Sequence, residues 1–155
     1  MPGLHGVTPA QLAHINRARH RLDSWPDSVP GLARTKQRCF IAPLSSGNIA
    51  LLANMARRAG LPWDHIFSAE TFQRCKPHPD TYPGLARQPD LAPEQVMMVA
   101  ARSSDLRAAL ARGLPKGFIP RPTEYGPPQN TDLRAEEACD VVAADLTDLA
   151  TRMRV

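Results

Sequence analysis

The chain has few of the features that are typical of membrane proteins or of small secreted proteins. Its 155 residues include three cysteines, and aromatic residues make up 5% of the sequence. Cys39, Cys75 and Cys139 are widely spaced and form no Cys-X-X-Cys pair, which favours reduced thiols. No apolar run approaches the length of about 20 residues that a membrane-spanning helix needs, and the first residues lack a basic segment followed by an apolar core. We therefore expect a cytoplasmic protein with no membrane partner.

The charge balance is mild and does not indicate nucleic-acid binding. The net charge is +4, and 43% of residues are apolar, as in an ordinary one-domain globular protein. Thr8-Pro9-Ala10-Gln11 predicts a helix that begins with a capping box and a proline at its first position. Basic residues of this helix lack the spacing of a recognition motif and have few aromatic neighbours, so a solvated face explains them better. They are Arg17, Arg19, His20 and Arg21, beside an apolar stripe of Leu12, Ile15 and Leu22.

Short apolar runs alternate with helical patterns along the rest of the chain. The run at 39–44 leads through Ser45-Ser46-Gly47-Asn48 into a helix at 49–59, which Gly60 ends. The other predicted strands lie at 66–69, 96–101, 117–120 and 140–144. The other predicted helices lie at 30–37, 81–87 and 146–152, and one more carries residues 106–110, capped by Ser103 or Ser104 and ended by Gly113. This alternation predicts an α/β fold with a doubly wound parallel sheet and right-handed crossovers.

Polar side chains follow three of the predicted strands. Ser45 and Ser46 end the first, Lys76 follows the second, and Asp105 follows the third. Ligands of doubly wound sheets bind beyond the carboxyl ends of the strands, where a helix N-terminus also favours an anionic group. Taken alone, the two serines are better explained as helix caps. The hydroxyl, ammonium and carboxylate groups on successive strand ends together favour a functional site.

Three motifs together resemble the haloacid dehalogenase (HAD) superfamily, and in particular its type II 2-haloacid dehalogenase branch. They are Leu44-Ser45-Ser46-Gly47-Asn48, the segment at 76–82, and the strand at 96–101 followed by 105–109. Residues 20–27 resemble the end of the helical cap of that branch, and 121–126 resemble a loop of its core. The resemblance implies a C-terminal remnant of the cap at 1–24 and a HAD-like, Rossmannoid core at 25–155 that lacks its first central strand.

The resemblance implies hydrolysis of the carbon–halogen bond of a 2-haloalkanoic acid. In the family, an aspartate that ends the first strand attacks C2 and displaces halide, and water then hydrolyses the ester with inversion at C2. Ser45, Ser46 and Tyr82 would bind the substrate. Lys76 would keep the nucleophile ionised, and Asp105 would position the lysine and the water. The branch needs no metal or other cofactor, and dimers are common in it, so we expect neither cofactor nor metal and allow for a homodimer.

The sequence departs from the family at the nucleophile. No apolar strand ending in Asp precedes the run at 39–44, and the similar segment at 141–145 matches the last core strand instead. The first two-thirds of the cap, with the family's substrate-binding arginine, are also absent. Ser46, Ala100 and Arg102 stand where the branch usually has Asn, Ser and Asn. We therefore expect the C-terminal part of a longer protein, with two strand edges facing a gap in the core.

Two other functions are compatible with these residues. One is a catalytically inactive fragment that at most binds anions. The other is a phosphatase of the same superfamily, which would use Mg²⁺, although Asp105 has no acidic neighbour in sequence. A protein tyrosine phosphatase is excluded despite its resemblance to Trp25-Pro26-Asp27, because no arginine stands six positions after any cysteine.

Overall fold

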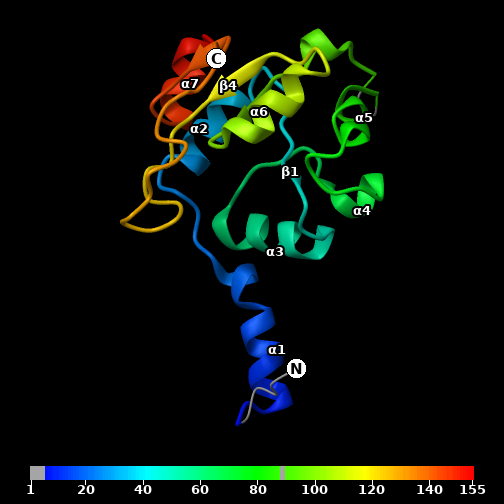
Figure 1. Cartoon of the computed structure of the whole chain (residues 1–155), viewed down its shortest axis with the longest axis vertical. Helices are drawn as coiled ribbons and strands as arrows, with labels where there is room; N and C mark the ends of the chain where they lie inside the picture. Colours follow the sequence, from blue (N-terminus) through cyan, green and yellow to red (C-terminus); the bar gives the residue numbers. More distant parts are fainter. Residues whose placement is uncertain (1–5, 88–89) are drawn as a thin grey trace.

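The structure is a computed structural model that describes residues 6–87 and 90–155. Helix α1 (Pro9–Asn16) extends away from the α/β body, and the C-terminus lies at the opposite end of the molecule (Figure 1). Residues 1–5 of the expected cap remnant lie outside the described part. No helix within the described residues has the length and apolar character needed to cross a membrane.

Helix α1 begins as predicted and ends sooner than predicted. Gln11 N–H donates to Thr8 Oγ1 at 3.2 Å, and Thr8 N–H donates to Gln11 Oε1 at 2.8 Å, which completes the capping box. A 3₁₀ turn, η1 (Ala18–Arg21), follows and lies against helix α3 (Ile49–Ala59). The apolar stripe of α1 is not buried: Ile15 is 58% exposed and Leu22 is 55% exposed.

All strand pairs are parallel, as predicted, but they form two separate sheets. Strand β1 (Leu44–Ser45) pairs with β2 (Phe67–Ser68). In the second sheet, β4 (Lys116–Phe118) lies between β3 (Met98–Ala100) and β5 (Val141–Val142). Across the described ranges no ladder joins β1 to β3. The chain therefore has the α/β fold that was expected, with a gap where a central strand would join the two sheets.

The helices lie close to the predicted positions. They are α2 (Ser28–Thr35), α3, α4 (Ala69–Phe72), α5 (Pro83–Arg87), α6 (Ser103–Leu110) and α7 (Leu146–Arg152), with 3₁₀ turns η2 (Pro79–Thr81) and η3 (Pro93–Gln95). The predicted serine cap of α6 is wrong. Arg102 occupies the cap position without a side-chain hydrogen bond, and Ser103 is already helical. The N–H of Ser103 donates instead to Asp132 Oδ1 at 2.9 Å, so a loop 29 residues away satisfies this helix end.

Two apolar clusters stabilise the body. The larger contains Phe67, Tyr82, Met98 and Phe118, and the smaller contains Ile119 together with residues of β5 and α7. Helices α2 and α7 pack closely beside the smaller cluster. A Cβ atom at Gly31 would lie 2.5 Å from the carbonyl carbon of Leu146, so only glycine permits this approach.

Candidate active site

Ser45 and Ser46 lie at the carboxyl end of β1, and neither of them caps α3. Asn48 is the cap, because its side chain accepts a hydrogen bond from Leu51 N–H at 2.7 Å. Ser45 Oγ accepts from Gly47 N–H at 3.0 Å. Ser46 Oγ accepts from the backbone N–H of Lys76 at 3.2 Å, which ties the end of β1 to the loop after α4. The explanation of these serines as helix caps is therefore wrong, and the side chains are available for another role.

Lys76, whose backbone N–H contacts Ser46, forms an ion pair with Asp105. Lys76 Nζ donates to Asp105 Oδ2 at 2.7 Å, and the two side chains are 20% and 15% exposed. Lys76 comes from the loop that follows β2 and α4, and Asp105 comes from the first turn of α6, after β3. The predicted convergence of groups from three successive strand ends is thus present. An ammonium can donate three hydrogen bonds, and this is the one recorded for Nζ among the described residues.

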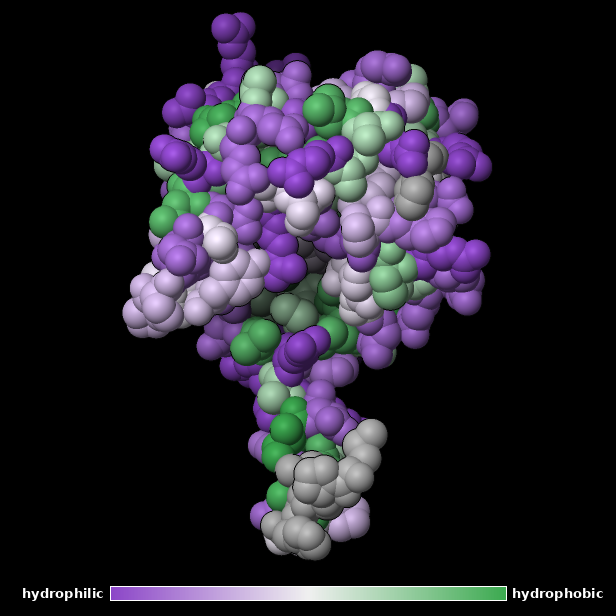
Figure 2. Space-filling model, in the orientation of Figure 1, coloured by the Kyte–Doolittle hydropathy of each residue, from purple (hydrophilic) through white to green (hydrophobic). Residues whose placement is uncertain are grey.

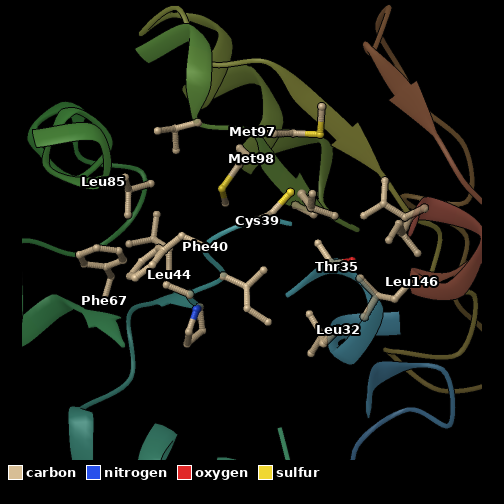
Figure 3. Close-up of a pocket in the computed structure, with 18 of the residues that line it drawn as sticks. Leu32, Thr35, Cys39, Phe40, Leu44, Phe67, Leu85, Met97, Met98 and Leu146 are labelled. Carbon is tan, nitrogen blue, oxygen red and sulfur yellow. The ribbon is translucent and has the colours of Figure 1, made fainter. Parts of the chain in front are cut away.

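A mostly apolar cavity of about 480 Å³ lies between the two sheets and reaches this ion pair. The runs at 39–44 and 96–101 line it from opposite sides, and Lys76 and Asp105 contribute its charged groups together with Arg121. Figure 3 shows Leu44 and Phe67 on one side of this space and Met97 and Met98 on the other. The molecular surface is also hollowed in the middle of the body, with apolar residues in the depth of the hollow (Figure 2). The expected gap is therefore a real cavity.

Tyr82 lies next to this site but is inaccessible from the solvent. Its side chain is completely buried in the larger apolar cluster, and its hydroxyl has no hydrogen-bond partner in the part of the chain that the structure describes. Burial, and then the negative charge of Asp105, raises the pKa of Tyr82 to about 12. The phenol is therefore a neutral donor without an acceptor, and its contact with substrate stays a prediction.

Comparison with known proteins finds dehalogenases that are similar to this chain. No family model matches the chain. The crystal structure of the L-2-haloacid dehalogenase PA0810 superposes with a TM-score of 0.93 at 46% sequence identity, over 95% of this chain and 63% of that one. The chain is thus similar, over nearly its whole length, to L-2-haloacid dehalogenases of the HAD superfamily.

Two further relatives of this dehalogenase family agree. The (S)-2-haloacid dehalogenase of Xanthobacter autotrophicus is 28% identical over 178 residues, which cover 98% of this chain and 68% of that protein. The structure of L-2-haloacid dehalogenase from Xanthobacter autotrophicus with chloropropionic acid covalently bound is 26% identical, with a TM-score of 0.80 over 95% of this chain and 67% of that one. The chain thus spans about two thirds of the length of the dehalogenases that it matches.

A partly buried ion pair joins the start of the α/β core to the loop after β4. Arg121 donates two hydrogen bonds to the carboxylate of Asp27, at 2.8 and 2.7 Å, and the side chains are 14% and 12% exposed. The same carboxylate accepts from Leu146 N–H at 2.8 Å, and the Arg121 guanidinium lies over the ring of Trp25. The two partners are 94 residues apart in sequence, and no local pattern predicted that they meet.

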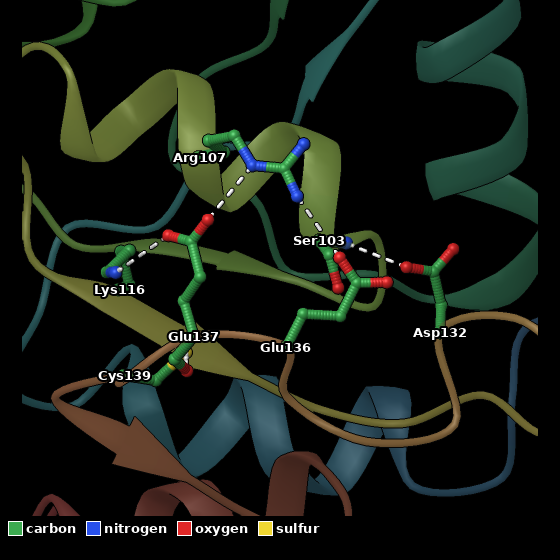
Figure 4. Close-up of polar contacts among 7 residues, drawn as sticks. All are labelled: Ser103, Arg107, Lys116, Asp132, Glu136, Glu137 and Cys139. Carbon is green, nitrogen blue, oxygen red and sulfur yellow. Dashed lines mark hydrogen bonds and ion pairs between the residues drawn. The ribbon is translucent and has the colours of Figure 1, made fainter.

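A polar network holds the loop before β5 against α6, the helix that carries Asp105. Arg107 donates to Glu137 Oε1 at 2.9 Å and to Glu136 Oε2 at 3.1 Å, while Lys116 Nζ lies 3.9 Å from Glu137 Oε2 (Figure 4). The hydrogen bond of Glu137, and then its charge, raises the pKa of Arg107. Together with the bond between Ser103 and Asp132, these contacts fix the position of α6.

The three cysteines are free thiols, as expected. Metal-ligating side chains do not gather into groups of three or more within residues 6–87 and 90–155. Asp105 has Lys76 as its near neighbour, at 2.7 Å.

Proposed function

We propose that this chain supplies the substrate-binding and lysine-bearing part of a 2-haloacid dehalogenase. The observation that carries the proposal is the Lys76–Asp105 pair at the carboxyl ends of two parallel strands, tied through Ser46 to the end of β1. The similarity to L-2-haloacid dehalogenases over nearly the whole chain supports the same role. A carboxylate that enters here meets an ammonium and two serine residues beside an apolar cavity.

Each group has a role that follows from its chemistry. Lys76 donates to a carboxylate oxygen with the N–H groups that Asp105 leaves free, and the Ser45 hydroxyl donates to the substrate carboxylate. Asp105 holds the lysine in place through its ion pair. Its carboxylate can also accept a hydrogen bond from a water molecule. The apolar walls of the cavity accept the carbon chain and the halogen, and they exclude bulk water.

The hydrolysis that we propose has two steps and needs a carboxylate nucleophile at the end of a strand, which the sequence before the run at 39–44 does not supply. An oxygen of that carboxylate bonds to C2 as the carbon–halogen bond breaks, and halide leaves with the bonding electrons. Water then adds to the ester carbonyl carbon, and the bond from that carbon to the ester oxygen breaks with the electrons going to the oxygen. This releases the 2-hydroxy acid and restores the carboxylate, and one proton of the water passes to the solvent. Lys76 favours both steps because a cation stabilises the free carboxylate and the developing oxyanion. No metal ion enters either step.

Titration calorimetry with L-2-chloropropionate tests the proposal on the chain as it stands. We expect binding of the acid, weaker binding of the uncharged 2-chloropropionamide, and at least a tenfold loss of affinity for the acid in Lys76→Met. Lys36→Met is the control, because Lys36 forms a more exposed pair with Asp64 and does not line the cavity. Ser45→Ala should weaken binding more moderately and provides a second variant.

Two results of these binding measurements would contradict a role of Lys76 in substrate binding. Equal affinity of the wild-type chain for acid and amide, or unchanged binding of the acid in folded Lys76→Met, would show that Lys76 and Asp105 form a structural ion pair in an inactive fragment. Phosphate-ester hydrolysis that depends on added Mg²⁺ would favour the phosphatase alternative.

A further inference from the structure

Arg102 places a second positive charge beyond the carboxyl end of β3. It is the N-cap residue of α6, and Asp105, the partner of Lys76, is the third residue of the same helix. In a capping box these two helix positions lie close enough to contact each other. Ala100 and Ala101, which stand immediately before Arg102, line the cavity and have only methyl side chains. Two small residues thus connect the cavity wall to the arginine.

The guanidinium of Arg102 is held in position but keeps its hydrogen-bond donors. Its Cζ atom lies 5.2 Å from the centre of the Tyr125 ring, so the ring covers one face of the cation. Its Nη2 atom lies 3.6 Å from Glu124 Oε1, a distance that is too long for a hydrogen bond. The N–H donors of a guanidinium lie in its plane, and a ring on its face leaves them accessible. Within the described residues Arg102 therefore has an anionic neighbour that uses its charge only in part.

The surroundings of the two cations differ. The pair of Lys76 and Asp105 is mostly buried, whereas about half of the Arg102 side chain is exposed. A small acid whose carboxylate binds Lys76 at the cavity would direct its other end outward, past the two alanines. The group that complements a guanidinium best at that end is a second carboxylate, which accepts two parallel hydrogen bonds from it.

We propose that Arg102 is a specificity-determining residue that selects 2-haloacids with a second carboxylate, such as 2-halosuccinates. The first carboxylate binds Lys76 and Ser45, and the second replaces Glu124 as the partner of Arg102. The inference rests on the proposed function, because Lys76 has to bind the first carboxylate. It adds a substrate class to that function.

Titration calorimetry with two ligands tests this selectivity. The ligands are L-2-chlorosuccinate and its C4 monoamide, which has the same carbon chain and halogen but lacks the second charge. We expect the wild-type chain to bind the diacid at least about fivefold more tightly than the monoamide, and Arg102→Gln to reduce this ratio to less than about twofold. Arg112→Gln is the matched control, because Arg112 is exposed beyond the C-terminal end of α6, and it should keep the wild-type ratio.

Glu124→Gln provides a second test with the opposite sign. This substitution removes the carboxylate that competes for Arg102, so the ratio of diacid to monoamide affinity should rise above the wild-type value. A purely structural role of the pair of Arg102 and Glu124 would change the ratio in the same direction in both variants, and that result would overturn the inference.

The monoamide separates this inference from the proposed function. Monoamide binding that depends on Lys76, without a preference for the diacid or with the same preference in Arg102→Gln, would overturn the role of Arg102 and leave the proposed function in place. Absence of binding of both ligands to the wild-type chain would overturn both.

Discussion

Asp27 is the single residue on which the stability of the core depends most clearly. Its carboxylate accepts two bonds from Arg121 and one from Leu146 N–H, so it connects three segments that are distant in sequence. Asp27→Asn leaves the partly buried guanidinium without its counter-charge, and we expect the free energy of unfolding to fall by about 2 kcal/mol in urea denaturation. Asp23→Asn is the control, because the Asp23–Arg58 pair is exposed and should contribute about 1 kcal/mol or less. Equal effects of the two substitutions would contradict this account.

The same residue predicts a dependence of stability on pH. Burial alone would raise the pKa of Asp27, but the bonds from Arg121 and Leu146 outweigh burial and hold this pKa below its ordinary value of 3.8. Since the folded pKa is the lower one, the stabilisation is complete above 3.8 and is lost as the pH falls through the folded pKa. The difference in unfolding free energy between the wild-type chain and Asp27→Asn should therefore shrink from about pH 7 to about pH 2, measured by urea denaturation at each pH. A constant difference over this range would show that Asp27 is not responsible.

At the scale of one element, the N-terminus of helix α3 has two neighbouring polar residues with different roles: Asn48 caps the helix, and Ser46 contacts the loop that carries Lys76. Asn48→Ala removes the acceptor of Leu51 N–H and should reduce the free energy of unfolding by about 1 kcal/mol. Ser46→Ala should cost less stability, because Ser46 does not cap the helix and is exposed, yet it removes the bond to the Lys76 N–H. Thermal denaturation of the two variants compares them directly. A larger loss from Ser46→Ala would restore the capping explanation for the serines.

Local sequence patterns predicted where the helices and strands lie. They predicted the lengths of the strands and the long-range contacts less well. The capping box of α1, the glycine end of α3 (φ of 71° at Gly60) and the bounds of α7 follow from a few adjacent residues. The strands are shorter than the apolar runs. Strand residues are defined by pairing with a neighbouring strand, and within the described residues β1 pairs on one side only, with β2, and β3 on one side only, with β4. The cap of α6 was wrong because Asp132, far along the chain, replaces the expected serine. No local periodicity could have predicted the Asp27–Arg121 pair.

At the scale of the whole molecule, the site and the gap belong together. Ser46, Lys76 and Asp105 meet because the strands are parallel and their carboxyl ends lie on one side. The same topology places the unpaired edges of β1 and β3 directly beside them. The two sheets thus enclose a cavity, and the polar groups that we assign to dehalogenation lie at its edge.

The most direct test of this assignment is a chimera. The part of the PA0810 L-2-haloacid dehalogenase that this chain does not cover would be fused to this chain, and chloride release from L-2-chloropropionate would be measured by ion chromatography. We predict that the chimera releases chloride, that Lys76→Met in the chimera reduces the rate by about 1000-fold or more, and that Lys36→Met leaves it unchanged. A folded chimera that releases no chloride, or one whose rate is indifferent to Lys76→Met, would contradict the account.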